Sequence, residues 1–227
     1  MKKLIIALPA YNEEKVIASV LQQIKQAIKK LTDLDCEIVV INDCSTDGTA
    51  RIVCKNKVTL LNHKINRGLG GSLATAFVYA QRKKADCLVT MDSDGQHDPQ
   101  DLLNVIDPVI NDDVDVVIGI RKLNQMPFDR QIINASSSFL TFLFFGVWCS
   151  DTQSGFRAFG KKAINSIQLK TQRMEASSEF FSEISRSKLA FREVRIKVIY
   201  TKYSRSKGQS NLNAFSVLLK LFMRLFR

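Results

Sequence analysis

Two aspartates separated by one residue, in the stretch Met91–Asp98 (MDSDGQHD), are the strongest chemical signal in this chain. They follow the apolar run Cys87–Thr90, which predicts a buried β-strand that ends where the carboxylates begin. Because side chains two residues apart point to the same side of an extended chain, Asp92 and Asp94 are expected to converge. Converging carboxylates raise each other's pKa unless a cation or a donor lies between them. The spacing therefore predicts a Mg²⁺ or Mn²⁺ site that takes further ligands from a substrate diphosphate.

Three alternative roles for the aspartate pair fit the sequence less well. The carboxylates could serve as turn and helix-cap residues leading into Asp98-Pro99, but a turn does not need paired carboxylates at a strand end. A calcium-binding EF-hand loop requires Gly at its sixth position, whereas Gly95 is fourth from Asp92. A phosphatase of the haloacid dehalogenase type would resemble Asp-x-Asp-Gly-Thr, but Gln96 replaces the Thr.

The composition of the 227 residues favours one α/β domain with anionic partners. A formal net charge of +11, with the basic excess gathered after residue 155, predicts nucleotides, lipid phosphates or a membrane surface as partners. Nucleic acid is not expected, because no helix-turn-helix, zinc-finger or RNP-type pattern is present. Five scattered cysteines without a CxxC pair favour a reducing cytosol.

The hydropathy pattern predicts contact with a membrane surface but no membrane span. No uninterrupted run of about 18 apolar residues exists, and Leu4–Ala10 is interpreted as a first strand, not a signal peptide, because it runs directly into Glu13-Glu14. The aromatic run Ile132–Trp148 and the stretch Ala214–Arg227, a basic stripe on an apolar helix, would suit a lipid interface. The alternative for both is a core or dimer helix.

Apolar strands alternate with amphipathic helices through the first half of the chain. The expected strands are Leu4–Leu8, Glu37–Ile41, Val58–Leu61, Cys87–Met91 and Val114–Ile118. The expected helices are Glu13–Leu31, one from about Ala50, Ser72–Arg82 and Leu102–Ile110. This alternation predicts a parallel sheet covered on both faces, with ligands beyond the carboxyl ends of its strands. The polar clusters expected to converge there are Pro9–Glu13, Asn42–Thr49, Asp92–Asp98 and Gly119–Arg121.

With these motifs in order, the chain resembles the family 2 glycosyltransferases of the GT-A fold, and within them the dolichol- or polyprenyl-phosphate mannosyltransferases. The resemblance covers nearly the whole chain and rests on Pro9–Glu13, Asn42–Thr49, Asn66–Gly71, Asp92–Gln96, Asp151–Arg157 and Arg205–Asn211. It implies a mostly parallel α/β GT-A domain over residues 1–211. Residues 1–120 would form a nucleotide-binding half and residues 121–211 an acceptor-binding half, followed by an amphipathic membrane-interface helix over 212–227.

The resemblance also implies the roles of individual residues. The base and ribose would be held by Pro9, Tyr11, Glu13 and Asp43. Asp92 and Ser93 would flank the nucleotide, and the metal would be ligated by Asp94 and Gln96, with Asp92 binding directly or through water. The donor phosphates would contact Arg121 and Arg205, which with Asp92 and Asp94 form the expected catalytic set. The acceptor lipid phosphate would contact Arg130, and the sugar pocket would be lined by Asp151, Gln153 and Ser154.

The function expected from this resemblance is a metal-dependent, inverting transfer of a hexose to polyprenyl or dolichyl phosphate. The favoured donor is GDP-mannose, with UDP-glucose or another UDP-sugar as the alternative, and an envelope glycan as the alternative acceptor. The enzyme would be attached peripherally to the cytoplasmic face of the membrane, by interface helices or through a separate small membrane protein. A non-catalytic nucleotide-binding scaffold is less favoured, because the metal residues are intact.

Overall fold

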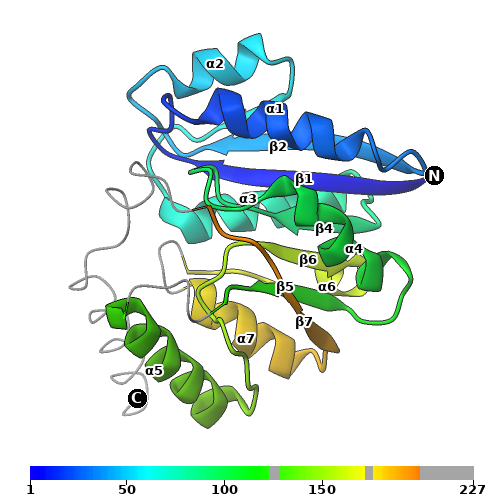
Figure 1. Cartoon of the computed structure of the whole chain (residues 1–227), viewed down its shortest axis with the longest axis vertical. Helices are drawn as coiled ribbons and strands as arrows, with labels where there is room; N and C mark the ends of the chain where they lie inside the picture. The colour runs from blue at the N-terminus through cyan, green and yellow to red at the C-terminus, as the bar shows by residue number, and fades with distance from the viewer. Residues whose placement is uncertain (123–127, 172–175, 200–227) are drawn as a thin grey trace.

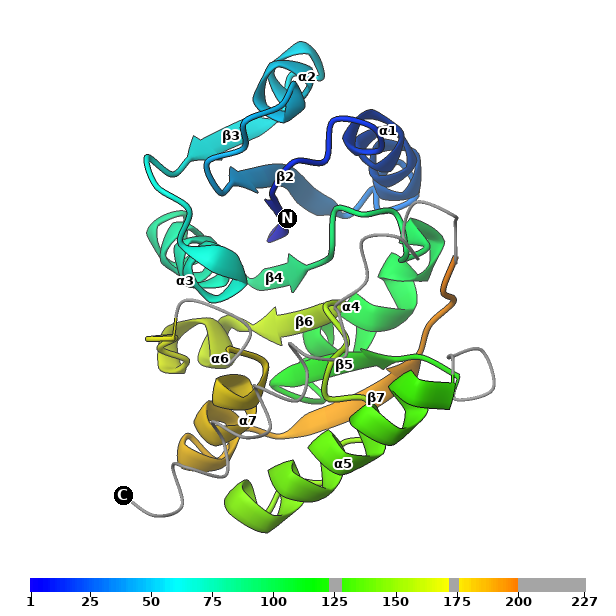
Figure 2. The ribbon, with the colours of Figure 1, turned by 90° about the vertical axis from the view of Figure 1, so that its left-hand side faces the viewer.

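The computed structural model of the chain describes residues 1–122, 128–171 and 176–199. They form one seven-stranded sheet with helices on both faces (Figures 1 and 2). The strands are β1 (Lys2–Ala10), β2 (Leu34–Asn42), β3 (Thr59–Asn62), β4 (Cys87–Thr90), β5 (Val116–Ile120), β6 (Arg157–Gly160) and β7 (Phe191–Arg195). The helices are α1 (Ile17–Ile28), α2 (Thr49–Lys55), α3 (Gly68–Arg82), the 3₁₀ turn η1 (Pro99–Asp101), α4 (Leu102–Ile110), α5 (Phe128–Phe145), α6 (Lys161–Ser166) and α7 (Ala176–Arg186).

The strand order across the sheet is β3-β2-β1-β4-β6-β5-β7. The first four strands pair in parallel, as the alternating sequence predicts. β6 runs antiparallel to both of its neighbours, β4 and β5, while β7 pairs in parallel with β5. The sheet is therefore mostly parallel, with one reversed strand in its second half.

Each face of the sheet has its own hydrophobic core, because successive side chains of a strand point to opposite faces. On one face, Leu4, Ile6 and Leu8 of β1 pack with the apolar sides of α1 and α4. On the other face, Ile5 and Ala7 pack with α3, α6 and α7. Figure 2 shows the two layers, with α1 and α4 on one side and α3 and α6 on the other.

Several boundaries differ from the sequence prediction, and three of the differences bear on the site. The first helix begins at Ile17, not Glu13, because the Glu13 carbonyl oxygen accepts the amides of Val16 and Ile17 in a preceding turn. α3 begins four residues earlier than expected, at Gly68. β5 extends to Ile120, because β7 pairs alongside it to that residue. The prediction that Gly119–Arg121 lies past the strand was therefore wrong for Gly119 and Ile120.

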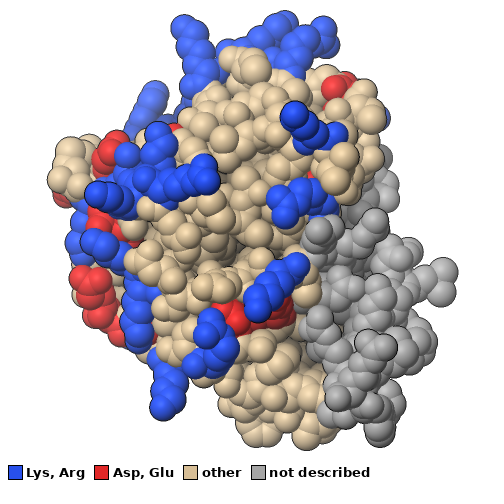
Figure 3. All heavy atoms as spheres, turned by 180° about the vertical axis from the view of Figure 1, so that it is seen from behind, with Lys and Arg blue, Asp and Glu red and all other residues tan. Residues whose placement is uncertain are grey.

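The predicted 212–227 interface helix lies outside the described residues, as does Arg205. Lys and Arg side chains are spread over the face opposite to that of Figure 1 (Figure 3). Several of the basic residues after position 155 are paired, and these ion pairs are Lys162–Asp115, Arg186–Glu183 and Arg192–Asp113.

Candidate active site

The loops that follow β1, β2 and β4 are tied to one another at the carboxyl end of the sheet. The amide of Asn12 donates to the Ser45 hydroxyl at 2.9 Å, and the Thr46 amide donates to Asn12 Oδ1 at 2.8 Å. The hydroxyl of Ser93 donates to the carbonyl oxygen of Pro9 at 2.7 Å. In Figure 1 the N-terminus marks the amino end of β1, so these loops lie at the opposite end of that strand. The predicted convergence of the first, second and fourth strand loops is confirmed by these contacts.

The two remaining residues predicted in the first loop differ in exposure. The amide of Glu13 donates to the Thr49 hydroxyl at 2.8 Å, and the Glu13 side chain is buried. Tyr11 exposes 48% of its surface at the sheet edge. An exposed aromatic ring offers a stacking surface and a carboxylate offers a hydrogen-bond acceptor, which are the two groups that a base and a ribose require.

Asp43 stands at the centre of the second loop, and its carboxylate is already engaged by the protein. Oδ1 accepts from the Arg67 amide at 2.8 Å and lies 2.7 Å from His63 Nδ1, while Oδ2 accepts from the Gly68 amide at 2.7 Å. A carboxylate at a helix N-terminus satisfies amides that have no partner within the helix. This contact explains why α3 begins at Gly68.

The aspartate pair lies directly after β4, and the two carboxylates have different partners. Asp92 Oδ2 lies 3.1 Å from Nε2 of His97, whereas Asp94 accepts from the backbone and side-chain amides of Gln96. Asp94 and Gln96, both predicted as metal ligands, are therefore adjacent.

The electrostatics of the pair follow from these partners. Partial burial of Asp92 opposes ionisation, but the hydrogen bond and charge of His97, with more distant charges on Arg121 and Arg157, outweigh it and hold the pKa of Asp92 below its ordinary value. Burial and the nearby charge of Asp92 raise the pKa of Asp94 above its ordinary value, although Gln96 partly offsets them.

A divalent cation fits this donor set. A carboxylate whose pKa is raised by a neighbouring carboxylate regains its ionised form when a cation lies between the two. Mg²⁺ and Mn²⁺ are commonly held by one or two carboxylates together with waters and substrate phosphates. Among the residues that the structure describes, no group of three or more His, Cys, Asp or Glu side chains is placed to hold a metal. Asp92, Asp94 and Gln96 are the chain's own candidates.

The loop between α5 and β6 carries the predicted sugar-pocket residues. Asp151 is 1% exposed and forms a bidentate ion pair with Arg121, whose Nε and Nη2 each donate at 2.7 Å. The Arg121 amide also donates to Asp151 at 3.1 Å. Arg121, predicted as a phosphate contact, is thus fixed against a predicted sugar-pocket residue.

A buried arginine holds the same loop in place. The guanidinium of Arg157 donates to the carbonyl oxygens of Thr152 and Ser154, each at 2.9 Å, and lies 4.6 Å from the centre of the Phe180 ring. Its burial lowers the pKa of the guanidinium from its ordinary value. Arg157 therefore connects the loop to α7.

The same loop touches the metal loop at a glycine. A Cβ built on Gly155 would lie 2.5 Å from Oδ2 of Asp92 and closer still to its Oδ1. No side-chain atom fits at these distances, so position 155 accepts only glycine while Asp92 keeps this orientation. The contact joins two predicted motifs that are far apart in the sequence.

α5 has its polar side against the protein and its apolar side in solvent. The buried side holds Asn134, Ser137, Ser138 and Thr141. Gln153 Nε2 and the Thr152 hydroxyl both donate to the Ser137 hydroxyl, at 3.0 and 2.9 Å. Within the described residues, the buried atoms Asn134 Oδ1, Ser138 Oγ and Ser154 Oγ have no hydrogen-bond partner.

The outward side of α5 is a row of large apolar side chains, which we call the apolar stripe. Its members are Phe128, Ile132, Phe139, Phe142 and Leu143, each between 50% and 76% exposed. At 3.6 residues per turn these positions share one side of the helix. Trp148 extends the stripe, with its ring 6.0 Å from that of Phe142. In the described part of the chain, no helix combines the length and apolar character needed to cross a bilayer.

Two predicted site residues have no described side chain. Arg130 belongs to α5, but nothing of its side chain is described, and Arg205 lies beyond the described residues. Sequence reasoning missed the contributions of His97, Gly155 and Arg157. All three lie inside quoted motifs, but the contacts of Gly155 with Asp92 and of Arg157 with Phe180 join distant parts of the chain, and the group that His97 faces depends on how its loop folds.

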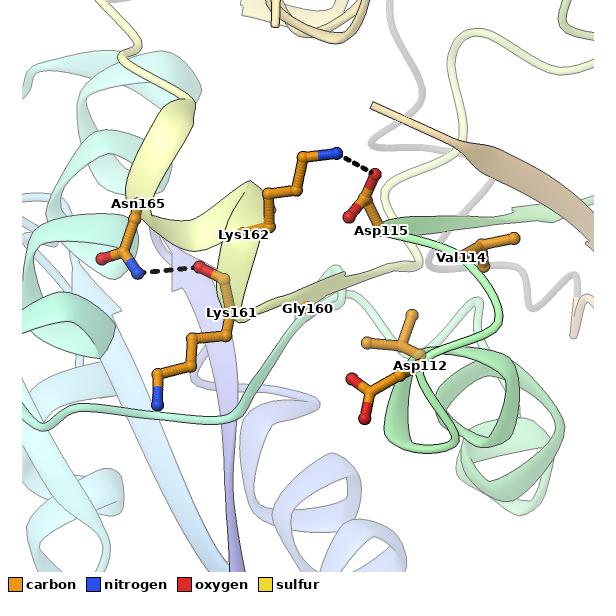
Figure 4. Close-up of a pocket in the computed structure, with 8 residues that line it drawn as sticks. Asp112, Val114, Asp115, Gly160, Lys161, Lys162 and Asn165 are labelled. Atoms are coloured by element: carbon orange, nitrogen blue, oxygen red, sulfur yellow. Dashed lines mark hydrogen bonds and ion pairs between the residues drawn. The ribbon is translucent and has the colours of Figure 1, made fainter. Parts of the chain in front are cut away.

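A cavity of about 490 Å³ lies away from this site (Figure 4). It is lined by Asp112 and Asp115 before β5 and by Lys161, Lys162 and Asn165 in α6. The amino end of β5 and the carboxyl end of the antiparallel β6 meet at the sheet edge opposite to the aspartate pair. The charged groups that line the cavity partly pair with each other, because Lys162 lies 3.0 Å from Asp115.

Comparison with known proteins identifies the family to which the chain belongs. The model of glycosyl transferase family 2 matches residues 5–167. The chain is 36% identical, over 98% of its length and 96% of the relative's, to the UDP-N-acetylglucosamine–dolichyl-phosphate N-acetylglucosaminyltransferase of Methanococcus voltae. It is 27% identical to the undecaprenyl-phosphate mannosyltransferase of Micrococcus luteus, over 74% of this chain and 70% of that protein.

A solved structure confirms the GT-A fold. Glucosyl-3-phosphoglycerate synthase from Mycobacterium tuberculosis, in complex with Mn²⁺, uridine diphosphate and phosphoglyceric acid, superposes with a TM-score of 0.68. The match covers 97% of this chain and 78% of that protein, at 18% sequence identity.

Proposed function

This chain belongs to glycosyl transferase family 2, and from that membership we propose that it moves a sugar from a nucleotide donor to a polyprenyl or dolichyl phosphate. The observation that supports this most directly is the contact between Asp92 and Gly155. It brings the aspartate pair, suited to a metal-bound diphosphate, against the loop that carries Asp151, the partner of Arg121. A donor phosphate and the sugar attached to it need these two groups side by side.

The proposed roles divide the domain at about residue 120, with a donor half before it and an acceptor half over 121–211. The donor base and ribose would bind at Pro9, Tyr11, Glu13 and Asp43, with Ser93 beside the nucleotide. Asp43 would contribute to nucleotide binding indirectly, by holding its loop in place. Its own carboxylate oxygens already contact Arg67, Gly68 and His63.

Mg²⁺ or Mn²⁺ would be held by Asp92, Asp94 and Gln96, and when bound it supplies positive charge to the departing diphosphate. Arg121 and Arg205 are proposed to add charge to the same phosphates. Asp151 fixes the guanidinium of Arg121 in one orientation, so no reorganisation is needed when the negative charge develops.

A lipid phosphate acceptor simplifies the chemistry that the chain must perform. Its phosphate oxygen is already anionic at pH 7 and needs no general base. Orientation of this nucleophile would then supply much of the rate, and Arg130 is proposed to hold it. A single displacement by the acceptor oxygen inverts the anomeric carbon. The sugar would lie against Asp151, Gln153 and Ser154, beside the buried polar side of α5.

The apolar stripe of α5 supports a place at the membrane surface. A helix with a polar side against the enzyme and an apolar side in solvent can enter a lipid interface while its inner side faces a polar substrate. We propose peripheral attachment at the cytoplasmic face, through this stripe and the 212–227 segment, with or without a small membrane protein.

The donor is proposed to be UDP-N-acetylglucosamine, the donor in the name of the Methanococcus voltae relative. GDP-mannose, expected from the sequence, is the second candidate, and the mannosyltransferase relative favours it. The test is a donor screen with UDP-N-acetylglucosamine, GDP-mannose and UDP-glucose, using a short polyprenyl phosphate in detergent with Mg²⁺ or Mn²⁺. Product formation identifies the sugar. Nucleotide binding without transfer from any donor would support a scaffold instead, and a product of retained anomeric configuration would contradict the single displacement.

A further inference from the structure

We propose that His97 is a positioning residue that fixes the Asp92 carboxylate for a metal-bound nucleotide. This inference rests on the proposed function, because it concerns the same site. His97 Nε2 lies 3.1 Å from Asp92 Oδ2, and the His97 side chain is 4% exposed while that of Asp92 is 39% exposed. The histidine therefore contacts the carboxylate from the protein side and leaves part of it open to a ligand.

The imidazole is held firmly enough to orient its partner. Its ring packs against that of Phe156, with centroids 5.5 Å apart and planes tilted by 57°. The His97 backbone forms an antiparallel bridge with Val198, and next to it the Ile199 amide donates to the Gln96 carbonyl oxygen at 2.8 Å. The ring is thus fixed both by packing and by the chain on either side of the bridge.

Asp92 is confined from a second direction. The space where a Cβ of Gly155 would lie is filled by the Asp92 carboxylate, with Oδ2 2.5 Å from that position and Oδ1 closer still. The carboxylate therefore contacts both the imidazole of His97 and the position of Gly155. The hydrogen bonds that Asp94 accepts within the described residues come from Gln96 in the same loop, so distant elements do not confine it in this way.

The other ring nitrogen, Nδ1, supports a role for His97 in the hydrogen bond to Asp92. A hydrogen bond to the carboxylate requires a proton on Nε2. Nδ1 is buried and has no partner among the described residues. An unpaired buried polar atom costs free energy, which a purely apolar side chain packed on Phe156 would avoid. The chain keeps the imidazole despite this cost, as expected if Asp92 needs a donor.

Removal of such a partner of a metal ligand typically weakens metal affinity by about ten- to one hundred-fold. We therefore compare His97→Leu, which keeps an apolar group against Phe156, with His97→Gln, whose side-chain amide can still donate to Asp92. Binding of Mn²⁺ is measured by titration calorimetry and electron paramagnetic resonance in the presence of UDP or GDP. Thermal unfolding in parallel confirms that both variants fold.

The expected result is weaker Mn²⁺ binding by about ten-fold or more in His97→Leu, with affinity within a few-fold of the unchanged chain in His97→Gln. The Michaelis constant for the donor should rise more than kcat falls. In an Asp92→Ala background, His97→Leu should cause no further loss, since it acts through Asp92.

Three outcomes would overturn the proposal. These are unchanged Mn²⁺ affinity in a folded His97→Leu variant, an equal loss in both His97 variants, or a full further loss in the Asp92→Ala background. If His97→Leu does not fold, Gly155→Ala tests the same confinement from the other side, and unchanged affinity there contradicts it. Failure of the unchanged chain to bind Mn²⁺ with either nucleotide would instead reject the proposed function.

Discussion

The two halves of the sheet, proposed to bind donor and acceptor and called here the donor half and the acceptor half, are held together in different ways. In the donor half, four parallel strands end in loops that bond to one another through short polar side chains, as in the contacts of Asn12 with Ser45 and Thr46. In the acceptor half, the strand β6 is reversed, and an ion pair and a buried arginine hold the loop before it. The donor half follows general rules of α/β folding, whereas the acceptor half depends on particular charged contacts.

The polarity of the helices shows the same difference. α1 buries Ile17, Leu21 and Ile24 and exposes its polar side, as stability alone requires. α5 does the reverse and leaves buried polar oxygens unpartnered among the described residues. Such a helix stabilises the isolated protein poorly, and its arrangement agrees with the proposal that a lipid interface and a polar substrate bind on its two sides.

The largest expected effect is on the aspartate pair at the boundary between the halves. Asp94→Asn removes a charge from the proposed metal site, and we expect the transfer rate to fall by about 10³-fold, as when a preorganised electrostatic group is lost. Initial rates with radiolabelled donor measure this. Asp98→Asn, a nearby helix-cap residue, serves as the control and should retain most of the activity. An active Asp94→Asn variant would remove Asp94 from the metal site.

The next effect tests whether the acceptor half depends on its ion pair. Asp151→Ala leaves the Arg121 guanidinium buried without its partner, and we expect a loss of about 3 kcal/mol in the free energy of unfolding. Chemical denaturation measures it. The exposed pair Lys2–Asp112 is the control, and Asp112→Asn, a residue that tolerates the φ of +61° at this position, should cost less than about 1 kcal/mol. Equal losses in both variants would contradict the distinction drawn between the halves.

Gly155→Ala tests the contact that joins the two halves. The new methyl group would overlap the Asp92 carboxylate, so either the loop or the carboxylate must move, at a cost of about 1–3 kcal/mol. Denaturation and Mn²⁺ titration together separate the two responses. Gly146→Ala is the space control, because its added methyl group has no neighbour within 4 Å, although its φ of +66° adds local strain. An unchanged Gly155→Ala protein would show that the contact is not tight.

The apolar stripe allows a smaller and separate test. Replacement of Phe139 and Phe142 together by Ser should weaken binding to anionic lipid vesicles by about thirty-fold, since each ring contributes on the order of 1 kcal/mol when only partly buried. Vesicle sedimentation measures the change, and thermal unfolding should show only a small loss, because both rings are at least half exposed and Phe142 loses its contact with Trp148. Undiminished vesicle binding would place membrane attachment elsewhere in the chain.

The smallest effect is on the stability of the metal-free protein. The folded pKa of Asp94 is raised, so the folded state binds more protons between the ordinary and the raised pKa, and its stability falls as pH rises through that window. Above the window the full penalty remains. Asp94→Asn should therefore melt a few degrees higher at pH 7, and the difference should vanish below the ordinary aspartate pKa. A lower melting temperature at pH 7 would contradict the raised pKa.

The sequence predicted the donor half well, because the apolar runs and helical spacings that indicate its strands and helices involve residues close together in the sequence. Apolar runs indicated four parallel strands, and α4 begins and ends at the predicted residues, Leu102 and Ile110. The acceptor half was harder to predict. β7 is a half-exposed edge strand of sequence FREVR without an apolar run, and the reversed polarity of α5 conceals which of its sides is buried.

Some features of the candidate site could likewise be predicted from the sequence, and others could not. Asp92 and Asp94 were found because their spacing alone implies convergence. The pairing of Arg121 with Asp151 and the contact of Asp92 with Gly155 both join residues that are distant in sequence. Neither follows from periodicity, since only the folded chain brings these residues together. His97 was visible in the motif, but its purpose depends on which atom it faces.

Because Arg157 is buried, its electrostatic effect should depend little on ionic strength. Dissolved ions weaken attractions between charges that face solvent, but they reach a guanidinium enclosed by α7 and the preceding loop much less. Its electrostatic effect on the Asp92 carboxylate should thus persist in concentrated salt, when the surface lysines and arginines attract anions only weakly.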